Sequence, residues 1–282
     1  MLGIIGGTAL QQIPHAQHIK TIALITPFGA LKSPIKLFQI HDHEVAIIAR
    51  HGEHYELLPH EINNQANIWA LKSLGVKTLL CINEANAINP SIQIGDVILA
   101  NDFIDFTKGL RQHTFFGNGL AAKINFHPLT NALLALTLQS VARKVNLTCY
   151  QEKLCMVIEG PRYNTLSESL LQQHVYKADI VGQTQLPELF LAREAQMHVI
   201  SLNLITELDQ SHVDYTLQPD PEQLKQAIYI MLQKLYALLN QWLLTPLPTL
   251  LESERLTLEN TILTPVSKLS QQQKLLLSVL RQ

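Results

Sequence analysis

The chain has 282 residues, a formal net charge of -2 and 47% hydrophobic residues. This balance gives no electrostatic basis for binding a nucleic-acid backbone or an acidic membrane surface, and no apolar run approaches the length that spans a membrane. A small-molecule partner is favoured, and the length suits one large α/β domain because no linker-like stretch divides it.

The cysteines indicate the compartment. Cys81, Cys149 and Cys155 are odd in number, lie within or beside apolar runs and lack CxxC spacing. Such cysteines are typical of reduced thiols, and the N-terminus has no basic region followed by an apolar segment and a cleavage site. We therefore expect a cytoplasmic protein without a disulfide framework or a metal site.

The first elements end in groups that can hold an anion. Residues 2–5 predict a strand that feeds Gly6-Gly7-Thr8, where backbone N–H groups and a hydroxyl could cradle phosphate, although most such turns only reverse the chain. Residues 35–40 and 45–49 predict a hairpin, and the second run ends in Arg50-His51. These side chains offer donors to an oxyanion, with structural ion pairing as the alternative.

The middle of the chain alternates between helices and strands. Helical spacing from Ile62 ends at Gly75, and the buried run 78–82 predicts a strand that leads into polar residues 83–87. Residues 97–100 and 102–105 are strand-like, and residues 110–126 predict a long loop. A helix over 129–145, a strand over 153–158 and a helix over 166–175 follow.

A polar turn and two acidic residues follow the next strands. The apolar run 178–181 leads into Gly182-Gln183-Thr184-Gln185, Pro187 begins a helix, and a second apolar run, 198–205, leads to Glu207 and Asp209. Ligands of open α/β sheets bind where strands end, so residues 182–184 and 207–209 should border one pocket. An ordinary crossover with solvated acidic residues is the alternative. Helices over 221–244 and 269–280 complete the pattern.

Seven short blocks, in order, resemble the trimeric purine nucleoside phosphorylases, and within them the branch that cleaves 5′-methylthioadenosine or 5′-methylthioinosine. Each block is weak alone, but together they are specific and extend from residue 2 to about residue 244. They are residues 3–8, 26–29, 49–52, 63 with 65–72, 95–105 (as Gly95-Asp96 and Phe103-Ile104-Asp105), 159–163 and 179–194 (as 179–181, 186–188 and 191–194).

The resemblance implies one α/β domain over residues 1–245, in which a mixed, twisted sheet forms a distorted barrel flanked by helices. Residues 246–282 would form a C-terminal extension whose last helix packs on the same domain. The family assembles as a homotrimer, and phosphate attacks C1′ of the purine nucleoside and displaces the purine. No metal or organic cofactor is implied, because the phosphate anion itself stabilises the positive charge that develops on the sugar.

The family's functional residues map onto particular positions here. Phosphate would be held by Thr8, Arg50, His51, Asn83, Glu84 and Thr184. The nucleoside would contact Tyr163 at the base, Gly182 and Gln183 at the ribose, and His127 inserted from a neighbouring subunit. Glu207, with Asp209 nearby, would assist departure of the purine at N7.

Two departures from the family pattern keep other functions open. Glu207 replaces the usual Asp or Asn, and Glu84 lies in the phosphate strip, where a carboxylate about 4 Å from phosphate would be repelled by roughly 4 kcal/mol at an effective dielectric near 20. The leading hypothesis is a phosphorylase. The alternatives are a catalytically silent nucleoside-binding homologue and a hydrolytic nucleosidase in which Glu84 orients water.

Overall fold

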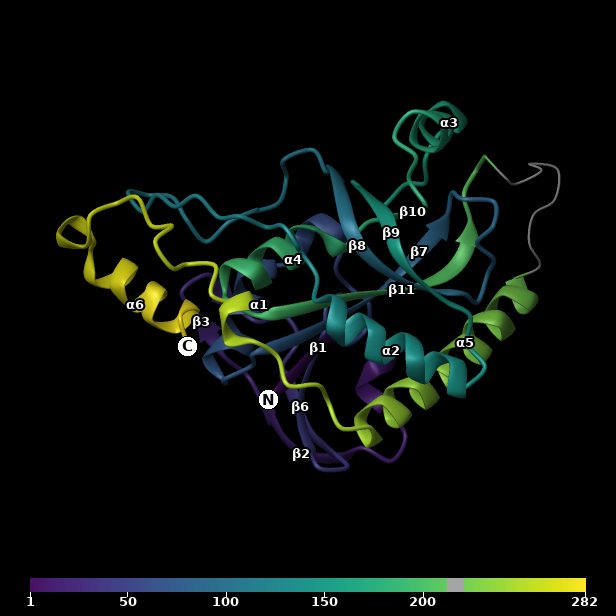
Figure 1. The fold of residues 1–282 in the computed structure, drawn as a ribbon, viewed down its shortest axis with the longest axis horizontal. Helices are drawn as coiled ribbons and strands as arrows, with labels where there is room; N and C mark the ends of the chain where they lie inside the picture. Colours follow the sequence, from purple (N-terminus) through teal and green to yellow (C-terminus); the bar gives the residue numbers. More distant parts are fainter. Residues whose placement is uncertain (212–220) are drawn as a thin grey trace.

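The computed structural model describes residues 1–211 and 221–282 and contains one α/β domain built on a mixed nine-stranded sheet (Figure 1). The strands run in the order β10-β9-β8-β11-β7-β1-β6-β5-β2. Their bounds are β1 Leu2–Gly6, β2 Gln17–Ile22, β5 Ile35–Ile40, β6 His43–Ala49, β7 Thr78–Ala87, β8 Val97–Phe106, β9 Cys149–Ile158, β10 Ile180–Gly182 and β11 His198–Leu208. A small hairpin pairs β3 Ile25–Thr26 with β4 Gly29–Ala30.

One half of the sheet closes into a barrel. Strand β10 pairs in parallel with β9 and also antiparallel with β7, so β7, β11, β8, β9 and β10 form a ring of five strands. The expected distorted barrel with flanking helices is confirmed. The remaining strands extend the sheet from β7 through β1 to the β5–β6 hairpin.

Helices cover both faces of the sheet because its buried strands are apolar on both sides. The helices are α1 Asn64–Ser73, α2 Ala132–Lys144, α3 Leu166–His174, α4 Gln185–Glu194, α5 Pro221–Leu244 and α6 Gln271–Leu280. Alternate residues of β1 point to opposite faces: Ile5 joins the core beside α1 and α4, whereas Ile4 joins the core beside α2 and α5. Trp242 of α5 is fully buried in the second core.

Two strands run further than their apolar segments predict. Strand β7 continues through Glu84 and Asn86 to Ala87, and β11 continues past Ile205 to Leu208. The two strands pair with each other in parallel along this whole length, so backbone hydrogen bonding extends them although their side chains become polar. The polar side chains are therefore carried on strands rather than on loops.

The segment after α5 packs against the helical layer that contains α1. Leu258, Leu269, Leu277 and Leu280 belong to the same buried cluster as Ile68 of α1. Hydrogen bonds join the segment to the end of α4: Thr257 donates to the Arg193 carbonyl, and Arg255 donates to the Gln196 carbonyl at 3.2 Å. No helix within residues 1–211 and 221–282 is both long and apolar enough to cross a membrane.

Candidate active site

A pocket of ≈ 440 Å³ lies where the parallel strands β1, β6, β7 and β11 end at their carboxyl sides. It gathers the turn after β1, the end of β6, the polar half of β7, the corner after β9, the turn after β10 and the end of β11. Of the residues selected from sequence, Thr8, Arg50, His51, Asn83, Glu84, Tyr163, Gly182, Gln183, Thr184, Glu207 and Asp209 all line it. Both expected turns, 182–184 and 207–209, therefore border one pocket.

His127 lies elsewhere. It is exposed on the segment between β8 and α2 and is not among the residues that line the pocket. Within one chain, the structure thus brings together eleven of the twelve selected residues and leaves His127 on the surface.

Arg50 is held by Glu188 of α4 in a buried ion pair. Its Nε donates to Glu188 Oε2 at 3.0 Å and its Nη2 donates to Oε1 at 2.5 Å, while Nη1 donates to the Ile82 carbonyl at 2.8 Å. Both side chains are nearly inaccessible, at 2% and 0% exposure. Burial lowers the pKa of Arg50, but Glu188 more than offsets that effect, so its pKa is raised overall. Sequence spacing gives no sign of this partner, because 138 positions separate the two residues.

His51 is neutral in this pocket. Burial, opposed by a backbone hydrogen bond and aided by the charge of Arg50, lowers its pKa to about 4. Nδ1 lies 2.8 Å from the Leu57 carbonyl oxygen, so Nδ1 carries the proton and Nε2 is left as an acceptor. The Tyr55 ring stacks on the imidazole with centroids 4.3 Å apart. Tyr55 therefore fixes the ring orientation and is a pocket residue that sequence reasoning did not select.

The two hydroxyls expected to bind phosphate also have partners within the protein. Thr8 Oγ1 donates to the Gly52 carbonyl at 3.2 Å, and Thr184 Oγ1 donates to Asn83 Oδ1 at 2.9 Å. Thr184 comes from the turn after β10, whereas Asn83 lies on β7. Their hydrogen bond joins two strands that face the same pocket.

Glu207 reaches the pocket through an irregularity in β11. The register between β11 and β7 shifts between Ile205 and Glu207, which is a β-bulge, so that Glu207 lies opposite Asn86. Tyr163 donates its hydroxyl to Glu207 Oε1 at 3.1 Å, and Asn86 Nδ2 approaches Oε2 at 3.5 Å. The bulge allows consecutive residues, Thr206 and Glu207, both to line the pocket.

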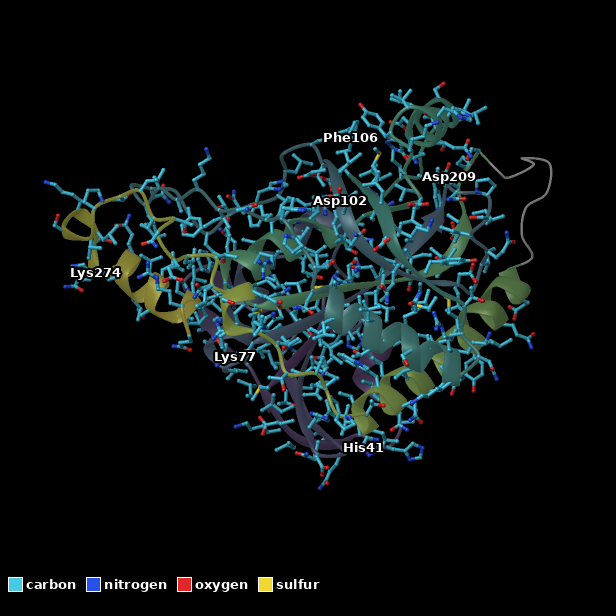
Figure 2. All side chains as sticks on the ribbon, in the orientation of Figure 1. His41, Lys77, Asp102, Phe106, Asp209 and Lys274 are labelled. Atoms are coloured by element: carbon cyan, nitrogen blue, oxygen red, sulfur yellow. The ribbon has the colours of Figure 1, made fainter. Side chains whose placement is uncertain are left out.

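Asp209 is buried just beyond the end of β11 (Figure 2). Its Oδ2 accepts from Asn164 Nδ2 at 3.2 Å, and its Oδ1 accepts from the backbone N–H and the hydroxyl of Ser211, each at 3.2 Å. These bonds anchor the chain immediately after Glu207. Asp209 thus supports the position of Glu207 as well as lining the pocket.

The side chain of Glu84 extends from β7 into the pocket. Its side chain is exposed to the cavity, and its pKa is raised, first by desolvation and next by the nearby charge of Glu207, with Arg50 opposing both. Arg50 forms its ion pair with Glu188 rather than with Glu84. The pocket therefore presents two carboxylates from neighbouring parallel strands.

Helix α5 supplies an apolar wall that the sequence did not associate with the site. Ile228, Leu232 and Leu235 line the pocket at helical spacing. Tyr236 of the same helix donates its hydroxyl to the Ala9 carbonyl at 2.8 Å, which fixes the turn that carries Thr8. Their periodicity in the sequence is that of an ordinary core-facing helix, so only the fold reveals that the helix contacts the site.

Gly160 allows the turn after β10 to pack closely. A Cβ atom at Gly160 would lie 2.0 Å from Gln183 Oε1, so no other residue fits there without moving that side chain. Gln183 also donates from Nε2 to the Arg162 carbonyl at 3.1 Å. Tyr163 is 55% exposed and presents an aromatic ring at the pocket mouth. Within residues 1–211 and 221–282, no group of three or more His, Cys, Asp or Glu side chains is placed to hold a metal ion.

Comparisons with known proteins agree with this arrangement. A family model described as "Phosphorylase superfamily" matches residues 2–242. The S-methyl-5'-thioadenosine phosphorylase of Saccharolobus solfataricus is 34% identical over 83% of this chain and 89% of its own length. That of Thermofilum pendens is 36% identical over 74% and 79%, respectively.

A solved structure of similar shape is a methylthioadenosine phosphorylase from an Antarctic soil metagenomic library, with a TM-score of 0.90, 28% identity and coverage of 99% of this chain and 98% of that one. The methylthioadenosine phosphorylase of Schistosoma mansoni in complex with tubercidin shares the fold with a TM-score of 0.78 over 86% and 90% of the two chains. The sequence match, the barrel and the pocket at its strand ends together establish that this chain belongs to the phosphorylase superfamily.

Proposed function

We propose that the protein is a purine nucleoside phosphorylase of the 5′-methylthioadenosine or 5′-methylthioinosine branch. In this reaction phosphate attacks C1′, the N-glycosidic bond breaks, and a free purine and a pentose 1-phosphate form. The observation that carries the proposal is the convergence of eleven residues at the family's functional positions, from six separate segments of the chain, on one pocket. Relatives named as S-methyl-5'-thioadenosine phosphorylases support the choice of branch.

The pocket has two parts of different chemistry. Thr8, Arg50, His51, Asn83 and Thr184 would surround the phosphate. Tyr163 and Gln183 would contact the base and the ribose, and the apolar wall of α5 suits a 5′-methylthio group better than a charged one. Glu207, with its Tyr163 hydrogen bond, would stabilise the proton at N7 of the departing purine.

Assembly and location complete the proposal. We infer a homotrimer, because His127 is exposed in one chain and would complete the 5′ end of a neighbouring site. We also infer a cytoplasmic enzyme that takes phosphate as its co-substrate and uses no organic cofactor or metal, since the phosphate anion can offset the positive charge that develops on the sugar.

The proposal is tested by measuring purine release from adenosine, inosine, 5′-methylthioadenosine and 5′-methylthioinosine at millimolar phosphate. We expect release from at least one 5′-methylthio nucleoside, with pentose 1-phosphate as the second product. No purine release from any of the four, with ligand-induced thermal stabilisation retained, would identify a silent nucleoside-binding homologue instead.

A further inference from the structure

The hydrogen-bonding capacity of the pocket points to a second acceptor for the pentosyl group. Four side chains selected as phosphate donors already donate to protein atoms: Thr8 to Gly52, Thr184 to Asn83, His51 to Leu57, and Arg50 to Glu188 and Ile82. The lining side chains also offer acceptors, namely the Glu84 carboxylate, Nε2 of His51, and the Glu207 carboxylate, which already accepts from Tyr163 and Asn86.

The charge balance points the same way. Among the described residues that line the pocket, Arg50 carries a fixed positive charge, and Glu188 neutralises it from outside the cavity. Glu84, Glu207 and Asp209 contribute carboxyl groups. A dianion would meet repulsion here, whereas a neutral molecule with two O–H donors would find acceptors on several sides.

We propose that the pocket also uses water as the acceptor, with Glu84 as the general base, so that the protein hydrolyses the nucleoside it binds. The proposal rests on the proposed function, because it uses the same nucleoside and the same leaving group. It differs in the nucleophile: a water molecule held by Glu84 on the C1′ side of the pocket in place of phosphate.

The step is balanced without any further reactant. The water oxygen forms a bond to C1′ while the bond from C1′ to the purine nitrogen breaks and its electron pair leaves with the purine. Glu84 takes one proton from the water, and that proton passes by way of Glu207 to the purine nitrogen, so that both carboxylates end the step as they began it. The products are a free purine and a pentose with a hydroxyl at C1′. Two carboxylates near the sugar also stabilise its developing positive charge.

The position of Glu84 suits a base. It lies on β7, whose partner β11 pairs Leu204 opposite it and carries Glu207 just beyond the bulge. The residues whose charges act on it, Glu207 and Arg50, are both fixed by hydrogen bonds to other residues. Desolvation and Glu207 raise its pKa, which brings a carboxylate closer to the range in which a general base is effective.

The test compares the wild-type protein with Glu84→Gln in phosphate-free buffer and in a phosphate titration, using 5′-methylthioadenosine and 5′-methylthioinosine. Purine release is followed by chromatography, and ³¹P NMR distinguishes pentose 1-phosphate from unphosphorylated pentose. Glu44→Gln, an equally conservative change at an exposed residue of β6, is the matched control.

The wild-type protein should release purine without phosphate and form unphosphorylated pentose. In Glu84→Gln this release should fall by about 10²-fold or more, as expected for loss of a general base, while the KM for phosphate falls by about tenfold because a repelling charge is removed. Glu44→Gln should change neither quantity. Slower release without phosphate together with a lower KM for phosphate is expected if Glu84 is a general base. A residue that only supports the pocket would not change the two quantities in this way.

Three results would overturn the inference. Purine release that vanishes without phosphate in the wild-type protein would exclude the hydrolytic step and leave the proposed phosphorylase intact. Equal losses of both activities in Glu84→Gln would show that Glu84 supports the pocket without activating water. Absence of purine release under every condition would contradict the proposed function as well.

Discussion

At the scale of single residues, the site depends on Glu207 at the β-bulge of β11. Its carboxylate accepts a hydrogen bond from the Tyr163 hydroxyl and lies beside the Asn86 side-chain amide. These two contacts hold the carboxylate of Glu207 in one position. Glutamate is one methylene longer than aspartate, and the register shift beside it changes where the carboxylate is directed.

Replacing Glu207 by Gln should lower kcat by about 10²- to 10⁴-fold, with a much smaller change in KM, because general acid–base assistance to the leaving purine is lost. Steady-state kinetics with Glu44→Gln as the control would measure this. A loss confined to KM would mean that Glu207 only binds substrate.

The buried pair of Arg50 and Glu188 makes a second residue-level prediction. Arg50→Met leaves the Glu188 carboxylate buried without its partner, and this should lower the free energy of unfolding by about 3–5 kcal/mol. Arg50→Met combined with Glu188→Leu should recover most of that loss, because neither charge then remains unpaired. Urea denaturation of the two variants would check this. A double variant that is no more stable than Arg50→Met would argue against the coupling.

Several residues of the site could be predicted from sequence, because each follows a strand whose end the apolar pattern marks. Thr8, Arg50, Thr184 and Glu207 are of this kind. Glu188 could not be recognised as the partner of Arg50, since the contact depends on the fold and not on spacing. Tyr55 likewise appears in the site only because the chain folds back to stack it on His51.

At the scale of elements, helices and strands could be predicted where the spacing of apolar residues is regular. They were harder to predict where pairing between strands extends a strand beyond its apolar residues. The β5–β6 hairpin and helix α5 follow their patterns closely. The polar ends of β7 and β11 could not be predicted as strands from their apolar pattern. They are strands because the hydrogen bonds between β7 and β11 continue into the pocket. Closure of the barrel depends on β10, a strand of three residues that pairs on both sides.

Helix α4 gives the fold a pH-dependent contact. Glu194 accepts the Thr114 hydroxyl and the Phe115 N–H, each at 2.7 Å, and burial raises its pKa to about 7, with these bonds opposing the shift. Because the folded pKa lies above the unfolded one, the associated stability is fully present below about pH 4.5 and is lost as pH rises through about 7.

Glu194→Gln should therefore flatten the decline in stability between about pH 4.5 and pH 7, where the wild-type protein loses up to about 3 kcal/mol at this residue. Thermal unfolding midpoints across that range would show the difference. Parallel pH profiles for the two proteins would contradict the assignment.

The terminal helix α6 contributes to the same core as α1. Leu280→Ala should lower the free energy of unfolding by about 2–5 kcal/mol, because the side chain is fully buried. Leu275→Ala on the same helix is the matched control: Leu275 is 59% exposed, and its loss should change stability by less than about 0.5 kcal/mol. Equal effects of the two substitutions in urea denaturation would mean that α6 is not docked.

At the scale of the whole molecule, strands distant in sequence meet at one end of a mixed sheet, and helices close both faces (Figure 1). The parallel strands β6, β1, β7 and β11 deliver their carboxyl ends to the same place, and α5 covers it with apolar side chains. This arrangement makes the pocket a property of the fold rather than of any one motif.

We propose that this pocket binds a purine nucleoside with C1′ facing Glu84 and Thr184. A crystal structure with a non-hydrolysable 5′-methylthio purine nucleoside tests it most directly. We expect purine N7 within hydrogen-bonding distance of Glu207 and the 5′ substituent against Leu232 and Leu235. Nucleoside bound in another cavity, or in this pocket with its purine remote from Glu207, would contradict it.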